Sequence, residues 1–137
     1  MNKTELAWAA GFIEGEGSVH FYLRKKHERY PNYAEPHITA DNSVKEYIEI
    51  LQRLLGGSIF MTKNKGKKIG KYETKHDLWR WHVTNLAAYR ACKRLLPYLH
   101  GKNRANAELV IKFYENRPPR ERDEKGRFLP RGPISWI

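Results

Sequence analysis

Apolar residues near the start of the chain predict a short helix. They cluster over residues 6–13 at helical spacing, and Thr4 precedes them as the expected N-cap. Gly15 and Gly17 end this helix and flank Glu16. The first helix is therefore expected to carry one acidic side chain at its end, between two glycines.

Alternation of apolar and polar residues predicts four strands. They are expected at residues 18–26, 33–40, 58–64 and 72–84. In the last strand Trp79, Trp81 and Val83 are expected to face the core, while the polar residues between them face outward. Turns are expected at residues 27–32 and, rich in glycine and lysine, at 65–71.

Three further helices are expected at residues 44–55, 85–96 and 103–116. Asn42 or Ser43 is the expected cap of the first, and Gly56-Gly57 ends it. Its apolar face comprises Val44, Tyr47, Ile48, Leu51, Leu54 and Leu55.

The element order α-β-β-α-β-β-α-α predicts an α+β fold. Helices are expected to cover one face of a four-stranded antiparallel sheet and to leave the other face to solvent or a ligand. Residues 1–116 are expected to form the domain. The composition changes at Pro118-Pro119, so residues 117–137 are interpreted as a basic tail, with Pro and Gly, that is loose unless bound.

Composition restricts the class of protein. The 137 residues suit one domain, and 26 Lys and Arg against 15 Asp and Glu give a net charge of +11. This excess favours a nucleic-acid partner, although ribosomal, membrane-surface and merely basic soluble proteins share it. The single cysteine, Cys92, excludes an intramolecular disulfide and a Cys-based zinc cluster. No apolar run is long enough for a signal peptide or membrane span, so an intracellular location in cytoplasm or an organelle matrix, without secretion or membrane insertion, is expected.

The stretch Ala9–Gly17 reads AAGFIEGEG and resembles the motif of the LAGLIDADG homing endonucleases. The name of that motif has Asp where this chain has Glu16. The resemblance extends over residues 6–116. Further matches to the short members of the family are Trp8, residues 36–42, residues 55–58, Trp81, residues 96–99 and Lys102.

The resemblance implies a fold, an activity and an assembly. The fold would be that of the LAGLIDADG homing endonucleases, whose sheet forms a DNA-binding saddle. The activity would be site-specific hydrolysis of one phosphodiester in each strand of double-stranded DNA, leaving short 3′ overhangs, with Mg²⁺ as cofactor and Mn²⁺ as a substitute. One motif copy implies a homodimer acting on a long pseudo-palindromic site, and the family is associated with intron mobility.

Small residues on the first helix suggest how such a dimer would form. Ala7, Ala10 and Gly11 recur on one helical face, which would let a second helix approach closely. With only one motif in the chain, that helix would come from an identical subunit. Glu14 is expected as an interface or capping carboxylate. A small-residue helix packed inside a monomer is the alternative.

Four residues form the candidate active site. By resemblance, Glu16 and the carbonyl of Gly15 would bind the metal ion, for which oxygen ligands are suited. Lys102 matches the lysine of the family's active site, and Asn42 matches a position that holds a water network. Glu16 and Lys102 could instead be ordinary surface residues, and a helix N-cap explains Asn42 equally well.

The outward side chains of the sheet are expected to contact DNA in the major groove. The candidates on strands are Ser18, His20, Tyr22, Arg24, Lys26, Tyr33, Glu35, His37, Thr39, Thr74, His76, Arg80 and His82. Phosphate contacts are expected from Lys63, Lys65, Lys67, Lys68 and Lys71. Each could equally be a solvated side chain, but the set together favours a DNA-binding surface.

The sequence is also compatible with two rival functions. The same fold could serve as a DNA-binding regulator that does not cut, or as a maturase acting on its host intron RNA. Glu16 and Lys102 argue against a pure binding protein, because binding alone does not need a carboxylate directed at a phosphate backbone.

Overall fold

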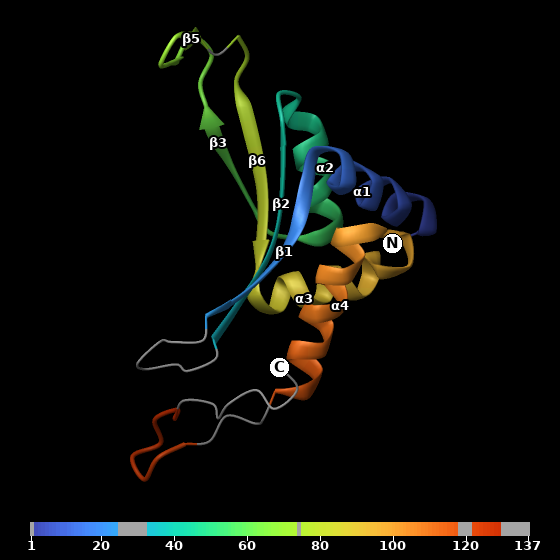
Figure 1. Ribbon diagram of the computed structural model, residues 1–137, viewed down its shortest axis with the longest axis vertical. Helices are drawn as coiled ribbons and strands as arrows, with labels where there is room; N and C mark the ends of the chain where they lie inside the picture. The colour runs from blue at the N-terminus through green and yellow to red at the C-terminus, as the bar shows by residue number, and fades with distance from the viewer. Residues whose placement is uncertain (1, 25–32, 74, 118–121, 130–137) are drawn as a thin grey trace.

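The computed structural model describes residues 2–24, 33–73, 75–117 and 122–129 (Figure 1). The elements in chain order are α1 (Lys3–Glu16), β1 (Gly17–Arg24), β2 (Tyr33–Asn42), α2 (Lys45–Leu55), β3 (Ser58–Lys63), β4 (Lys68–Ile69), β5 (Tyr72–Glu73), β6 (Leu78–Thr84), α3 (Asn85–Leu95), the 3₁₀ turn η1 (Leu96–Tyr98) and α4 (Gly101–Asn116). Apart from the small β4–β5 hairpin and η1, this is the predicted order.

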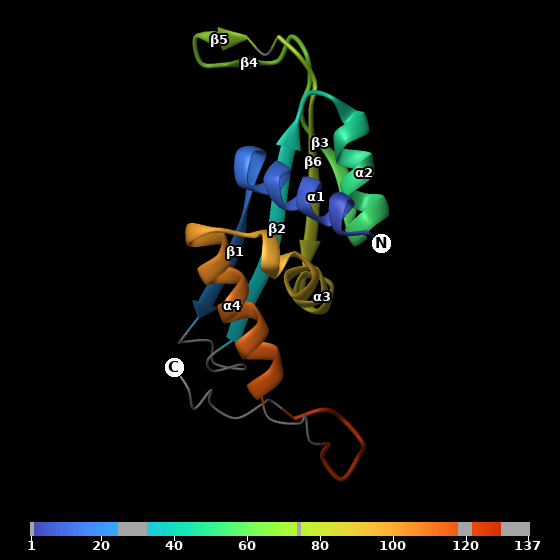
Figure 2. The ribbon, with the colours of Figure 1, turned by 90° about the vertical axis from the view of Figure 1, so that its right-hand side faces the viewer.

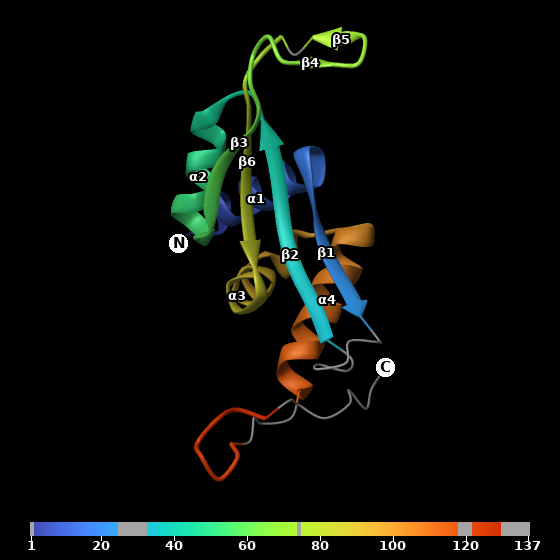
Figure 3. The ribbon, with the colours of Figure 1, turned by 90° about the vertical axis from the view of Figure 1, so that its left-hand side faces the viewer.

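The larger sheet has the strand order β1-β2-β6-β3, and each neighbouring pair is antiparallel. The helices lie against one side of this sheet (Figures 1 and 2). The opposite surface, called the outward face below, has no helix over it (Figure 3). The predicted α+β fold with one four-stranded antiparallel sheet is therefore confirmed.

Trp81 on β6 lies in the core with no exposed surface. Its indole Nε1 donates a hydrogen bond to the carbonyl of Gly56 at 2.7 Å, which ties the end of α2 to the sheet. The next residue, Gly57, has a φ of 92°, and a Cβ there would lie 2.6 Å from the carbonyl oxygen of His82. The predicted helix stop at this glycine pair thus also allows the chain to pass close to β6.

Gly17 marks the point where α1 ends and β1 begins. A Cβ on Gly17 would overlap the carbonyl oxygen of Thr39 and would lie 2.7 Å from the Cα of Ala40. Only glycine therefore lets β1 pair with β2 at this position. This close approach fixes the end of α1 beside the sheet.

The prediction of a fourth strand over residues 72–84 is wrong at its start. β6 begins at Leu78, and β5 pairs with β4 in a separate two-stranded sheet. Asp77 accepts a hydrogen bond from the backbone of Lys65 at 2.6 Å, which closes the base of this hairpin. His76 consequently lies outside β6, and Thr74 lies outside the described residues.

The first helix is longer than predicted and has a different cap. Its first residue is Lys3, and the side chain of Asn2 accepts a hydrogen bond from the backbone of Glu5 at 2.7 Å. Thr4 is therefore the second residue of the helix rather than its cap. Asn2 supplies the same chemistry as the predicted residue, because a short side-chain oxygen satisfies a free amide of the first turn.

The predicted cap of α2 is also wrong. The helix begins at Lys45, its N-cap position is Val44, and no side chain caps it. Asn42 instead binds the backbone amide of Val44 at 2.8 Å, in the turn before the helix. Val44 and Tyr47, predicted on the apolar face, are each 42% exposed, because this first turn extends beyond the core.

Helix α4 ends at Asn116, where the predicted domain ends. In the described part of the tail, Arg122 and Phe128 form an antiparallel bridge, and the guanidinium carbon of Arg122 lies 4.3 Å from the centre of the Phe128 ring. A loose arm over residues 117–137 stays a prediction. Within the described residues, no helix has the length and apolar character that crossing a membrane requires.

Candidate nucleic-acid interface and active site

Strand register gathers polar side chains on the outward face. His20 on β1 pairs with His37 on β2, and Asp41 on β2 pairs with Arg80 on β6. The predicted DNA-contacting residues that share this face, and whose side chains are described, are Ser18, His20, Tyr22, Glu35, His37, Thr39, Arg80 and His82. The side chains of Arg24 and Tyr33, and all of Lys26, lie outside the described residues.

An aromatic row crosses the four strands of the outward face. It consists of Tyr22 and His20 on β1, His37 on β2, His82 on β6 and Phe60 on β3. The ring centres of His20 and His37 are only 4.5 Å apart and their planes differ by 28°. At this distance the two rings lie face to face. The ring nitrogens of His20 lie at hydrogen-bond distance from two neighbours on β1, with Nε2 2.6 Å from the hydroxyl of Ser18 and Nδ1 3.5 Å from the hydroxyl of Tyr22. Phe60 was not among the predicted contacts, although the alternation of β3 places it outward.

The protonated, charged forms of His20 and His37 are disfavoured in this row. Burial lowers the pKa of His20, and the positive charges of Lys102 and Arg80 lower it further. Burial also lowers the pKa of His37, together with its neighbours His20 and His82, against an opposing effect of Glu35. At neutral pH these two rings are therefore uncharged groups that can both donate and accept hydrogen bonds.

Asp41 and Arg80 form a two-pronged ion pair on the outward face. The guanidinium Nε lies 2.6 Å from Oδ1, and Nη2 lies 2.8 Å from Oδ2. The carboxylate raises the pKa of Arg80. Asp41 was not among the predicted site residues, and only the register of β2 against β6 shows that it faces Arg80.

Glu16 is the last residue of α1, and its side chain is exposed. Within the described part of the chain, its carboxylate has no hydrogen-bond or ion-pair partner. The backbone carbonyl of Gly15 belongs to the last helical turn, where carbonyl groups lack partners in the helix and the helix dipole favours cations. A carboxylate and a backbone carbonyl are oxygen ligands that fit Mg²⁺.

One chain supplies only part of a metal site. Among the described residues there is no group of three or more His, Cys, Asp or Glu side chains that could hold a metal ion. The ligands of Glu16 and Gly15 would therefore have to be completed by water, by phosphate oxygens or by a second chain.

Lys102 lies in the first turn of α4, which begins two residues earlier than predicted. Asn103 accepts a hydrogen bond from the backbone amide of Val19 at 3.0 Å, and Asn106 donates one to the carbonyl of Val19 at 2.9 Å. These bonds hold α4 against the start of β1, and Lys102 is close enough to lower the pKa of His20. The structure therefore brings Lys102 to the same end of β1 as Glu16. The two asparagines were not predicted.

Asn42 is not placed as the prediction requires. Asn42 pairs with Trp79, so it belongs to the set of β2 residues that face the helices. Its side-chain oxygen accepts a hydrogen bond from the backbone amide of Val44. The last outward position of β2 is Asp41. A role for Asn42 in a water network on the outward face is therefore not supported by its position.

The residues of α1 that were predicted at the dimer interface differ in exposure. Ala7 and Gly11 are exposed, but Ala10 is completely buried in the core of its own chain. Gly15 lies on the exposed side in its place, and a Cβ on Gly11 or Gly15 would meet nothing within 4 Å. Trp8, 37% exposed, borders this surface. Dimerisation through it stays a prediction.

Glu14 is engaged within its own chain. Its carboxylate accepts a hydrogen bond from the backbone amide of His100 and lies 3.4 Å from Nδ1 of the same residue. This contact joins the end of α1 to the start of α4. A role of Glu14 at a dimer interface stays a prediction.

The predicted phosphate-contacting lysines lie around the β4–β5 hairpin, which projects beyond the end of the sheet (Figures 1 and 2). All five are exposed: Lys63, Lys65, Lys67, Lys68 and Lys71. Their position at the end of the sheet gathers positive charge beyond the outward face.

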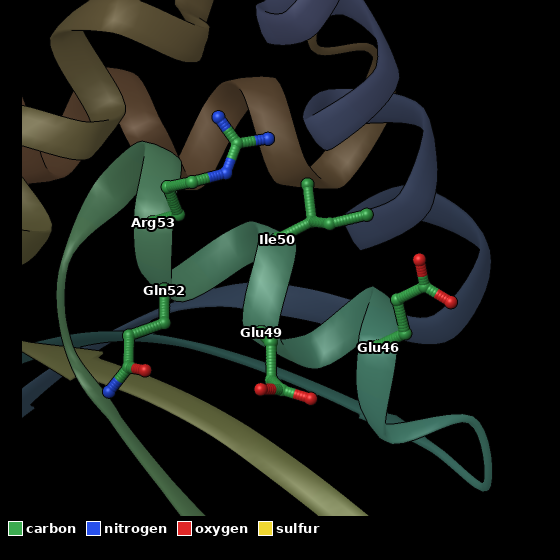
Figure 4. A pocket seen from close by; sticks show the side chains of 5 residues that line it. All are labelled: Glu46, Glu49, Ile50, Gln52 and Arg53. Carbon is green, nitrogen blue, oxygen red and sulfur yellow. The ribbon is translucent and has the colours of Figure 1, made fainter.

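A surface hollow on α2 is not a candidate site. It is lined by Glu46, Glu49, Ile50, Gln52 and Arg53, all from this helix (Figure 4). Its two carboxylates would repel phosphate, and α2 packs on the side of the sheet opposite the outward face.

No protein-family model matches the chain, and no curated protein matches its sequence. Solved structures do resemble it. The homing endonuclease I-CvuI in complex with its target superimposes with a TM-score of 0.59 at 21% identity, over 82% of this chain and 67% of the other. The LAGLIDADG homing endonuclease I-GzeII in complex with a DNA target gives a TM-score of 0.57 at 20% identity, over 81% of this chain and 35% of the other.

A third similar structure is an archaeal intron-encoded homing endonuclease, I-Vdi141I, complexed with DNA, with a TM-score of 0.54 at 17% identity over 82% of this chain. At these identities the comparisons establish a shared fold. The predicted LAGLIDADG homing-endonuclease fold is confirmed.

Proposed function

We propose that this chain is a subunit of a homing endonuclease of the LAGLIDADG type, which binds double-stranded DNA and cuts it with a divalent metal ion. One observation carries the proposal. Glu16 is exposed, has no partner among the residues that the structure describes, and ends a glycine-containing helix directly beside a polar outward face, in a fold shared with DNA-bound homing endonucleases. The net charge of +11 agrees with a polyanionic partner.

The position of each group of residues suggests its role. The outward face would lie in the major groove, and the lysines of the β4–β5 hairpin would contact phosphates. Glu16 and the carbonyl of Gly15 would hold Mg²⁺, with Mn²⁺ as a substitute. When bound, the metal ion would supply an activated water and stabilise the charge on the phosphate. Lys102 would offset the same negative charge from the start of α4.

The incomplete ligand set supports a dimer. Each chain brings one exposed carboxylate at the end of an exposed, side-chain-poor helical face. A two-fold pairing of these faces would place two such carboxylates near one axis and present two sheets to one DNA duplex. This arrangement implies a nearly palindromic site and one cut in each strand, with short 3′ overhangs as the predicted product.

The test compares Glu16→Gln with the unaltered chain on a plasmid library that carries randomised inserts. The unaltered chain is expected to linearise a subset of plasmids with Mg²⁺. Glu16→Gln should stop cleavage but retain binding, measured with Ca²⁺ in place of Mg²⁺. Glu46→Gln, which removes an exposed carboxylate on the far side of the sheet, is the matched control and should cut normally.

Each other outcome has a defined meaning. Normal cleavage by Glu16→Gln would show that the active site is assigned wrongly. Selective binding by the unaltered chain without cleavage would favour a DNA-binding regulator. Preference for structured intron RNA over every duplex would favour a maturase.

A further inference from the structure

The Asp41–Arg80 pair lies on the outward face near the end of β2. Its strands, β2 and β6, are the two central strands of the sheet, and the two residues are direct cross-strand partners. Phe60 is the register partner of Arg80 on the other side, on β3. The pair is therefore held by strand geometry and not by a flexible loop.

The ion pair uses only two of the five N–H donors of the guanidinium. Arginine has five N–H donors, and the bonds to Asp41 use the Nε–H and one N–H of Nη2. The two N–H groups of Nη1 and the second of Nη2 remain. The side chains are 40% exposed for Arg80 and 33% for Asp41, so these donors are accessible from the outward face.

The surroundings of the pair favour base edges over phosphates as its target. Phosphates follow the rims of a groove, whereas the central strands of a sheet laid into the groove face the base edges on its floor. A carboxylate fixed beside the arginine would also repel a phosphate. In contrast, a guanidinium in a fixed plane matches the two acceptors O6 and N7 of guanine.

We propose that Asp41 holds Arg80 as a rigid fork that recognises one guanine in each half of the DNA site. The proposal rests on the proposed DNA-binding function and names a determinant of its sequence specificity. Asp41 acts as a positioning residue, because it fixes the plane of the guanidinium without contacting the base. Arg80 makes the contact.

The experiment selects DNA duplexes from a randomised library with four proteins, in Ca²⁺ so that no strand is cut. These are the unaltered chain, Arg80→Lys, Asp41→Asn and Lys68→Ala. Arg80→Lys keeps the charge but loses the fork, and the affinity ratio for guanine over the other bases at one position per half-site should fall roughly ten- to hundredfold. Other positions should keep their preferences.

Asp41→Asn should weaken the same guanine preference while raising affinity for unrelated duplexes, because it removes a negative charge from the surface. A role of Asp41 in folding alone would not produce this combination. Lys68→Ala is the control for a phosphate contact. It should lower the affinity for all sequences alike and reduce the salt dependence of binding by about one counterion.

Two results would overturn the inference. In the first, Arg80→Lys selects the same sites as the unaltered chain. In the second, it behaves like Lys68→Ala, with a uniform loss and no change at any base position. Failure of the unaltered chain to enrich any duplex would contradict the proposed function as well, so the two failures are distinguishable.

Discussion

Replacing Gly11 by alanine separates the folding of one chain from the association of two. The residue lies inside α1, and a Cβ there would meet nothing within 4 Å. Alanine is more favourable than glycine in a helix interior by about 1 kcal/mol. The isolated chain of 137 residues should therefore gain stability, which corresponds to a rise in Tm of roughly 3 °C.

Association through the same face should change in the opposite direction. In a two-fold dimer the extra methyl groups would lie where two helices approach closely, and overpacking of such a contact costs about 1–3 kcal/mol. The dissociation constant of the dimer should then rise by roughly tenfold or more. Gly11→Leu places a larger side chain at the same exposed position and should prevent pairing more completely.

The assay combines thermal unfolding at low protein concentration with sedimentation velocity over a concentration series. Gly17→Ala is the matched control, because the same change there places a methyl group against the backbone of β2 and should destabilise the chain. If Gly11→Ala raises Tm and still associates as strongly as the unaltered chain, this face of α1 is not the dimer interface. If Gly11→Ala lowers the Tm of the monomer, Gly11 does not lie on an exposed face of α1.

Three further measurements test the fold and its electrostatics. The pKa values of His20 and His37 are lowered from their ordinary 6.5 in the folded chain. On acidification these side chains therefore bind protons at a higher pH in the unfolded chain than in the folded chain. Tm should fall as pH drops from about 7 to about 5.5, and less so in His37→Asn. Burial raises the pKa of Cys92 to about 12, so a thiol reagent at about pH 8 should label it only after unfolding. Trp81→Phe removes buried volume and the bond to Gly56, and urea unfolding should show a loss of about 1–3 kcal/mol.

Alternation of apolar and polar residues predicted most of the sheet correctly, because helices cover only one of its faces and every second residue of a strand faces them. It failed at the start of β6. Tyr72, Thr74 and His76 continue an alternating pattern, yet residues 72–73 pair with β4 instead. The deciding interaction, from Asp77 to the backbone of Lys65, joins residues twelve positions apart, and no local pattern contains it.

The candidate site shows the same division between local and non-local information. The motif located Glu16, and the residues after η1 located Lys102, because both depend on short stretches of sequence. Asp41 was missed in favour of its neighbour Asn42, since only the pairing of β2 with β6 determines which of the two faces outward. Ala10 was assigned to the open face of α1 because spacing alone does not show how far the core extends around a helix.

Gly17 connects the candidate chemistry to the candidate specificity. It allows β1 to approach β2 so closely that α1 ends directly at the sheet, which leaves Glu16 two residues from Ser18 on the outward face. The same pairing of β1 with β2 sets His20 opposite His37. A shift of one residue of β1 in this register would turn His20 and Tyr22 toward the helices and separate them from His37. Strand pairing, rather than the motif alone, therefore determines how Glu16 lies relative to the side chains of the outward face.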